Sequence, residues 1–372
     1  MWVVLYHYSA QCFPNLDPAQ YTHLFHKGYL AVDLFFMLSG FVMTHVYHRA
    51  FSETVTPQHY WKFIFARIAR VYPLHILVLL LFVATAVGFH LATGASPSLD
   101  DVPLRGPESV TAFVANVFML QGLKAGQLSW NYPAWSISVE FVAYLLFPFA
   151  LAAIWRLSGR AKVGVALSLL AALVILAGLS KGNFDQWDGP ITLARCLPEF
   201  IFGTLLYWVF RAAPADSWFA RDSAALLVIA AIVVCLHADG PDLLITCLFG
   251  AFIPIAVLNT GTFAKWAGAP ALIWLGDVSY SLYLLHGFLQ FSAGKLLAYF
   301  GVQNHANLSL GSSFVFMGLM VGTCLLAAHF TYFGVEIGCR QYLREILDAQ
   351  IKKRRAKMSK SAPSTRRISA PA

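Results

Sequence analysis

Charged residues are scarce in this chain of 372 residues: they make up 12% of it, while hydrophobic residues make up 58% and the mean hydropathy is +0.64. Soluble domains carry roughly a quarter charged residues, so the composition argues against an ordinary soluble domain, a disordered chain and a nucleic-acid-binding module. Internal repeats are also missing from the sequence. What recurs from end to end is an apolar run of about 20 residues, which is typical of a polytopic membrane protein.

Metal-binding and redox motifs are missing as well. None of the six cysteines (Cys12, Cys196, Cys235, Cys247, Cys324 and Cys339) forms a C-x-x-C pair, so the sequence predicts no metal site and no disulfide framework. A free cysteine in an apolar stretch behaves as a small hydrophobic residue. A disulfide between Cys12 and Cys196 is kept as a minor alternative.

The fold class predicted from these runs is all-α, a transmembrane helix bundle of about ten spans. A bilayer core tolerates only helices or closed barrels, and the runs lack the alternation of a barrel strand. The predicted spans cover residues 1–8, 29–48, 72–92, 133–155, 163–180, 193–210, 223–238, 243–259, 271–294 and 312–334. The first is expected to be truncated, because eight helical residues cover only about 12 Å of a hydrocarbon core roughly 30 Å thick. Either the true start lies upstream or this helix is incomplete.

The distribution of basic residues predicts the orientation. If the loops alternate and the C-terminus lies inside, twenty lysines and arginines fall inside and six outside, so both termini are predicted to be cytoplasmic. The whole net charge of +8 lies in residues 340–372, which hold ten basic residues and two acidic ones. We therefore expect a membrane domain over 1–338 and a basic, disordered cytoplasmic tail over 339–372, which can also hold anionic lipid headgroups.

Ionisable side chains inside a membrane are costly, so each one is a functional candidate. His7, Asp33 and Glu140 lie on three separate predicted spans, at similar depth near the outer face. A histidine beside a carboxylate is the usual general-base pair, because the carboxylate orients the ring and stabilises its charged form. The alternative is that each of the three makes a structural polar contact between helices.

Two further patterns are candidates for binding or catalysis. Arg67 and Arg70 lie three residues apart at the cytoplasmic start of the third span and could bind phosphate groups bidentately, or serve only as positive-inside anchors. Ser279, Tyr283 and His286 stand at i, i+4 and i+7 in the ninth span. Such a polar stripe must face the bundle or a cavity, for chemistry or for packing.

Five segments in this order resemble the acyltransferase 3 family of bacterial integral-membrane acyltransferases. The matching segments are V-L-Y-H-Y at 4–8, G-Y-L-A-V-D-L-F-F-M-L-S-G-F at 28–41, F-A-R-I-A-R-V-Y-P at 65–73, W-S-I-S-V-E at 135–140 and S-Y-S-L-Y-L-L-H at 279–286. The resemblance implies transfer of an acyl group, often acetyl, from cytoplasmic acyl-CoA to a hydroxyl of an extracytoplasmic carbohydrate or glycosylated acceptor. It also implies location in the bacterial cytoplasmic membrane. Acyl-CoA is the expected co-substrate, and no metal is expected.

The resemblance also implies roles for the candidate residues. His7 would be the catalytic base, and Arg67 and Arg70 would bind the CoA phosphates, while Asp33, Glu140 and His286 look like members of the family's buried polar set. One departure is that the family pattern places a basic residue eleven positions before the catalytic histidine, and only six residues precede His7.

Two other functions stay open from the sequence. A secondary transporter could pass an anionic solute along the arginines, although the inverted repeats common in transporters are missing. A non-catalytic lipid-binding or scaffold protein is the second alternative. Because no esterase-like domain is fused to the chain, transfer would finish within the helices or with a separate extracytoplasmic partner.

Overall fold

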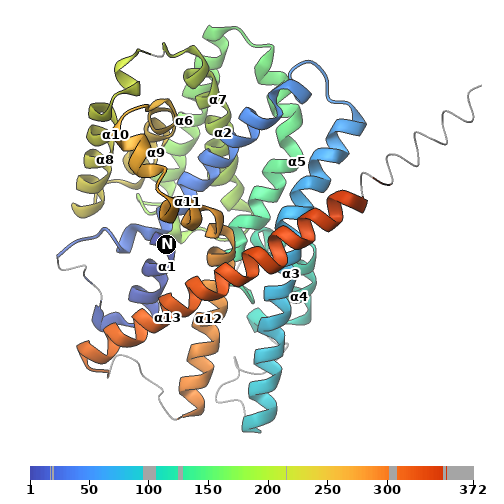
Figure 1. Ribbon diagram of the computed structural model, residues 1–372, viewed down its shortest axis with the longest axis vertical. Helices are drawn as coiled ribbons and strands as arrows, with labels where there is room; N and C mark the ends of the chain where they lie inside the picture. The colour runs from blue at the N-terminus through green and yellow to red at the C-terminus, as the bar shows by residue number, and fades with distance from the viewer. Residues whose placement is uncertain are drawn as a thin grey trace, which may run out of the picture.

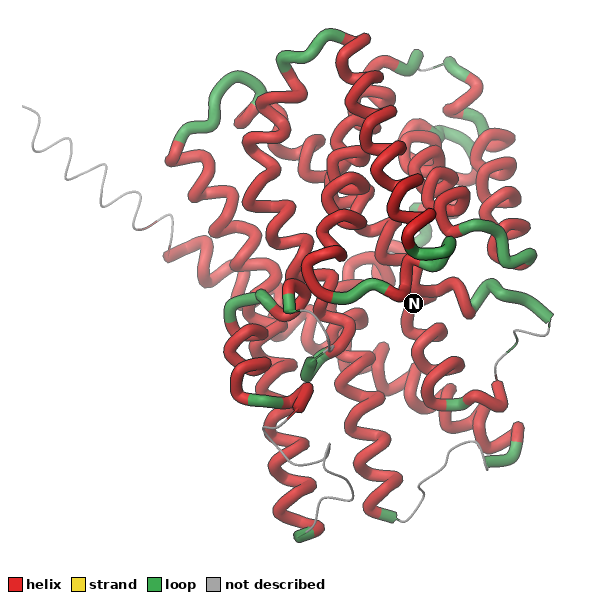
Figure 2. Tube along the Cα trace, turned by 180° about the vertical axis from the view of Figure 1, so that it is seen from behind, coloured by secondary structure: helices red, strands yellow, loops and turns green. Residues whose placement is uncertain are grey.

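The computed structural model describes residues 1–16, 18, 21–94, 106–124, 129–214, 216–300, 308–346 and 349. Figure 2 shows only helices and loops in this part of the chain, which confirms the all-α class. The longer helices are Ala31–Phe51 (α2), Pro57–Thr93 (α3), Trp135–Trp155 (α5), Gly159–Leu179 (α6), Leu193–Ala212 (α7), Ser279–Tyr299 (α12) and Leu310–Thr331 (α13). The shorter ones are Trp2–His7 (α1), Val110–Val117 (α4), Asp222–His237 (α8), Asp242–Leu258 (α9), Thr262–Ala267 (α10) and Pro270–Asp277 (α11).

The predicted number of ten spans is not confirmed. Six described helices are long and apolar enough to cross a membrane, and α11 with α12 would make a seventh if the two, which meet at a bend of 61°, form one span. The predicted spans at 223–238 and 243–259 correspond to α8 and α9, which have 16 and 17 residues. Helices of this length cover only about 25 Å, less than the roughly 30 Å of a hydrocarbon core.

A further boundary differs from the prediction. The last helix continues from α13 through a π-helical segment, Tyr332–Ile337, as far as Ile346, so the first residues of the predicted tail are helical. Beyond Ile346 the predicted tail lies outside the described residues, apart from residue 349. The connection between α3 and α5 contains the short helix α4. Cys12 and Cys196 are both free thiols, so the alternative disulfide is wrong.

The helices pack as two groups around α2, α3 and α5 (Figure 1). One core joins α2 to α6, α7 and α9, and a second core joins α1 and α3 to α12 and α13. A third core, between α2, α3, α5 and α7, ties the two groups together. In Figure 1 the last helix crosses the front of the bundle diagonally, so that its far end lies beside α3 and α5.

Helices α2 and α7 touch backbone to backbone at two glycines. A Cβ atom at Gly203 would overlap the carbonyl of Met37, and one at Gly40 would overlap the carbonyl of Phe200. Small residues permit this close approach, which is a common way to pack membrane helices.

Gly203→Ala is therefore expected to destabilise the protein by about 1–3 kcal/mol, because the helices must separate to admit the methyl group. Denaturant unfolding in mixed micelles measures this change. Gly88→Ala in α3 is the matched control, since nothing lies within 4 Å of a Cβ built at Gly88. If Gly203→Ala unfolds at the same denaturant concentration as the unaltered protein, the close approach of α2 and α7 is contradicted.

Candidate active site

Two histidines from distant parts of the chain lie ring against ring. His7 ends α1 and His286 lies in α12, and the Nδ1 atom of His7 is 3.0 Å from the Nε2 atom of His286. The rings are stacked with their centroids 5.0 Å apart. His286 is fully buried and His7 is half-buried, so the outer ring of the pair is the one that a substrate can reach.

The hydrogen bonds determine which nitrogen atoms of this pair carry protons when both rings are neutral. Nδ1 of His286 lies 2.6 Å from the carbonyl oxygen of Tyr283, and a carbonyl can only accept. His286 therefore donates from Nδ1 and accepts at Nε2. It follows that His7 donates from Nδ1 to His286, which leaves the lone pair on Nε2 of His7 for a substrate proton. This is the arrangement that a general base requires.

The segment before α5 holds α12 at this position. Asn131 donates from Nδ2 to the carbonyl of Leu284 at 3.0 Å, and the Tyr283 hydroxyl donates to the carbonyl of Pro133 at 2.7 Å. A Cβ at Gly287 would come within about 3 Å of Asn131 and Pro133, so this contact needs a glycine. These contacts hold in place the turn of α12 that carries His286.

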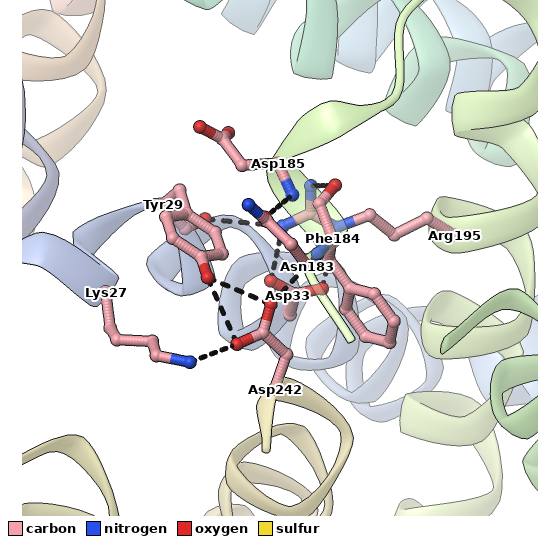
Figure 3. Close-up of polar contacts among 8 residues, drawn as sticks. All are labelled: Lys27, Tyr29, Asp33, Asn183, Phe184, Asp185, Arg195 and Asp242. Atoms are coloured by element: carbon pink, nitrogen blue, oxygen red, sulfur yellow. Dashed lines mark hydrogen bonds and ion pairs between the residues drawn. The ribbon is translucent and has the colours of Figure 1, made fainter. Parts of the chain in front are cut away.

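Asp33 is bound by an arginine rather than by His7. Arg195, in α7, donates from Nε to one carboxylate oxygen at 2.8 Å and from Nη2 to the other at 2.6 Å (Figure 3). Its Nη1 also donates to the carbonyl of Phe184 at 3.0 Å. Both charged side chains are fully buried, with 0% of Asp33 and 1% of Arg195 exposed. This bidentate pair joins α2 to α7.

A second buried carboxyl lies beside this pair. Glu199 follows Arg195 by one helical turn, is fully buried, and has no hydrogen-bond donor among the described residues at either oxygen. Because Arg195 and Glu199 are four positions apart, they lie on one face of α7. Removal of the arginine would leave the buried carboxylate of Asp33 without its counter-charge.

A second ion pair lies in the same region (Figure 3). Lys27 Nζ lies 2.7 Å from Asp242 at the start of α9, and the hydroxyl of Tyr29 donates to the same carboxylate at 2.9 Å. Lys27 and Arg195 are two of the six basic residues that the charge distribution predicts to lie outside. Arg195 lies inside the predicted span 193–210, and Glu199 lies one turn later, so two ionisable groups on one face of a span were the signal that was missed.

Glu140 has a third set of partners. The Tyr144 hydroxyl donates to Oε1 of Glu140 at 2.6 Å and lies 3.2 Å from the hydroxyl of Ser39. His7, Asp33 and Glu140 were predicted to lie together at one depth. In the structure their partners are His286, Arg195 and Tyr144, respectively, so neither carboxylate takes the place beside His7 that the sequence suggested.

Glu140 lines a cavity of 490 Å³ between α2, α3, α5, α12 and the last helix. Ser136 of α5 lines this main cavity, as do Tyr283 and Ser279 of the predicted stripe. The Ser136 and Tyr283 hydroxyls lie 2.7 Å apart, and the ring of Tyr283 is centred 5.6 Å from that of His286. The histidine pair therefore lies beside this part of the cavity.

Arginines line the cavity near Tyr47, which lies in the last two turns of α2. Arg67 donates from Nη2 to the Tyr47 hydroxyl at 3.3 Å, and its guanidinium lies 5.7 Å from the ring centre of Tyr47 and 5.9 Å from that of Phe63. Its Nε atom is buried without a hydrogen-bond acceptor among the described residues. Arg70 lines the same cavity, as do Arg340 and Arg344 of the last helix. Four cations at one mouth favour an anionic ligand with several phosphate oxygens.

No group of three or more histidine, cysteine, aspartate or glutamate side chains suited to a metal ion occurs in the described part of the chain. The polar groups that surround the cavity can instead bind anions, donate hydrogen bonds and accept a proton.

Most of the chain is similar in sequence to known proteins. A family model described as "Acyltransferase domain" matches residues 1–329. Protein 2 in the picA locus of Rhizobium radiobacter is 33% identical over 47% of this chain and 87% of its own length. The acyltransferase MdmB of Streptomyces mycarofaciens is 25% identical over 71% of this chain and 68% of its own length. A Staphylococcus aureus (strain COL) protein named "Putative O-acetyltransferase" is 23% identical over 70% of this chain, which spans 45% of that protein. No solved structure matches significantly.

Proposed function

Because this chain belongs to the acyltransferase domain family, we propose that it is a membrane O-acyltransferase that moves an acyl group, most simply acetyl, from cytoplasmic acyl-CoA to a hydroxyl group. The proposed acceptor is an extracytoplasmic glycan or another glycosylated molecule. We further propose that the chain lies in the bacterial cytoplasmic membrane with both termini inside, which puts twenty of its 26 lysines and arginines on the cytoplasmic side.

One observation carries the donor part of this proposal. The main cavity is lined by arginines and by Tyr283, and the ring of Tyr283 is centred 5.6 Å from that of His286. It follows α2 from Val32 to Tyr47, a distance of about 22 Å at the rise of an α-helix. An elongated donor with phosphates at one end and a thioester at the other suits such a cavity, with its phosphates on the arginines.

The reaction then needs one base and one stabilised oxyanion. Nε2 of His7 takes the proton of the acceptor hydroxyl as its oxygen attacks the thioester carbonyl, the carbon–sulfur bond breaks, and the proton leaves with the CoA thiol. General-base catalysis supplies about 10²–10⁴-fold. The hydroxyls of Ser136 and Tyr283 lie 2.7 Å apart at the side of the cavity next to His286. Because the Tyr283 proton is donated to the Pro133 carbonyl, Ser136 is the hydroxyl that can donate to the oxyanion once it releases Tyr283.

The direct test is release of free thiol from acetyl-CoA by the purified full chain in vesicles, with and without a surface-glycan acceptor. Acceptor-dependent release, together with acetyl groups on the glycan, is the expected result. Movement of an anionic solute without thiol release would favour a transporter instead. If neither thiol release nor acetylated product appears with the folded protein, the proposed donor is wrong.

Arg67→Gln tests the phosphate end of the cavity. A charge-assisted hydrogen bond contributes about 1.5–3 kcal/mol, so we expect the KM for acetyl-CoA to rise between tenfold and about a hundredfold, with a smaller change in kcat. Arg160→Gln is the matched control, because Arg160 is an exposed arginine at the start of α6. An unchanged KM in Arg67→Gln would show that the donor phosphates bind elsewhere.

A further inference from the structure

A second cavity lies next to the main one, where α3 begins. It also measures 490 Å³ and shares Tyr47, Ala66 and Arg344 with the main cavity, so the two form neighbouring chambers. The second chamber extends past α2 toward His59 and Lys62 in the first two turns of α3. The proposed reaction does not use this chamber.

The lining of the second chamber combines cations with aromatic rings. His59 and Lys62 are three residues apart on one face of α3, and Arg344 faces them from the last helix. The rings of Phe63 and Phe65 line the same chamber, and no acidic residue is found among the described residues that line it. Cations bind phosphate, and aromatic rings stack on the faces of bases.

Arg344 reaches this chamber because the last helix does not stop where the apolar run ends. The basic composition of residues 339–372 predicted that Arg340 and Arg344 lie in a disordered tail. The helix instead continues to Ile346 and lines both chambers. The two arginines are four residues apart and hence on one helical face. Arg340 lines the main cavity, and Arg344 lies where the two chambers meet.

We propose that the second chamber binds the nucleotide end of the donor, with Lys62 and Arg344 on its ribose 3′-phosphate and the aromatic rings against its base. This inference rests on the proposed function, in which acyl-CoA is the donor. Arg67 and Arg70 in the main cavity then hold the diphosphate, which lies nearer the thioester arm. The chamber thus selects thioesters of CoA over thioesters that lack the 3′-phosphate.

The first experiment measures binding without turnover. Adenosine 3′,5′-bisphosphate and AMP are titrated against the full chain in lipid nanodiscs, and we expect the bisphosphate to bind at least tenfold more tightly. In the double variant Lys62→Gln/Arg344→Gln this preference should fall to less than threefold, because two charged contacts to phosphate are lost. Arg160→Gln should keep the full preference. If the double variant also keeps it, the chamber does not bind the 3′-phosphate and the proposal is overturned.

The second experiment separates this proposal from the proposed function. Acetyl-CoA and acetyl-dephospho-CoA are compared as donors, and the double variant should lose the preference in kcat/KM for acetyl-CoA while retaining kcat. If the unaltered chain uses acetyl-CoA but the double variant discriminates as before, the chamber assignment fails and the function stands. If bisphosphate binding depends on Lys62 and Arg344 but no thioester releases thiol, the nucleotide site stands and the proposed function fails.

Discussion

Replacing His7 with alanine is expected to lower kcat for acyl transfer about 10³-fold, while the protein stays folded in the membrane. The expectation follows from the hydrogen bond between Nδ1 of His7 and Nε2 of His286, which leaves Nε2 of His7 as the free base. The magnitude is the middle of the range measured for general-base catalysis, about 10²–10⁴-fold. Thiol release from acetyl-CoA at saturating acceptor measures it, with the exposed His45→Ala in α2 as the control.

His286 variants separate the base from the residue that positions it. A methionine at 286 removes the acceptor for His7 Nδ1, whereas a glutamine can present a carbonyl oxygen near the position of Nε2. We therefore expect His286→Gln to retain more of kcat than His286→Met, with the KM for acetyl-CoA similar in both. If His7→Ala keeps full activity, His7 is not the base. If His286→Gln and His286→Met are equally active, the hydrogen bond between His7 and His286 does not contribute to kcat.

The second large effect concerns stability rather than chemistry. Arg195→Met should destabilise the protein by about 3–5 kcal/mol, because it leaves the buried carboxylate of Asp33 without its cation. Denaturant unfolding in mixed micelles measures this, and Arg221→Met is the control at an exposed arginine.

The same variant tests whether Asp33 has a catalytic role. The partner of Asp33 is Arg195, and that of His7 is His286, so the folded fraction of Arg195→Met should lose far less kcat than His7→Ala does. Equal losses of kcat per folded molecule would indicate that Asp33 acts on the base after all. An Arg195→Met protein as stable as the control would mean that the buried pair adds nothing to the fold.

Hydropathy was enough to predict that the chain is helical and built from membrane spans, because burial in lipid demands long apolar segments whatever their neighbours are. It could not count the spans. Helices α8 and α9 are as apolar as the others, and their lengths of 16 and 17 residues depend on where the chain turns. Composition likewise placed the end of the membrane domain near residue 338, but the last helix continues to Ile346.

The cost of burying charge marked Asp33, Glu140 and His7 as special without reference to a structure, since each needs a partner wherever it lies. The partner itself lies far away along the sequence. Asp33 meets Arg195 across 162 positions of sequence, and His7 meets His286 across 279. Nothing local connects these residues, and any carboxylate at a suitable depth satisfies the same rule.

The sequence by itself therefore determined the class of the protein, the family that its motifs resemble and a few of the polar residues that line its main cavity, namely Arg67, Arg70, Glu140, Ser279 and Tyr283. Only the tertiary structure decided that His7 lies within hydrogen-bond distance of a second histidine, that Asp33 belongs to an ion pair between helices, and that two arginines of the last helix join those of α3. The physical reason is that periodicity and polarity act along one helix, whereas a site forms where several helices pack side by side.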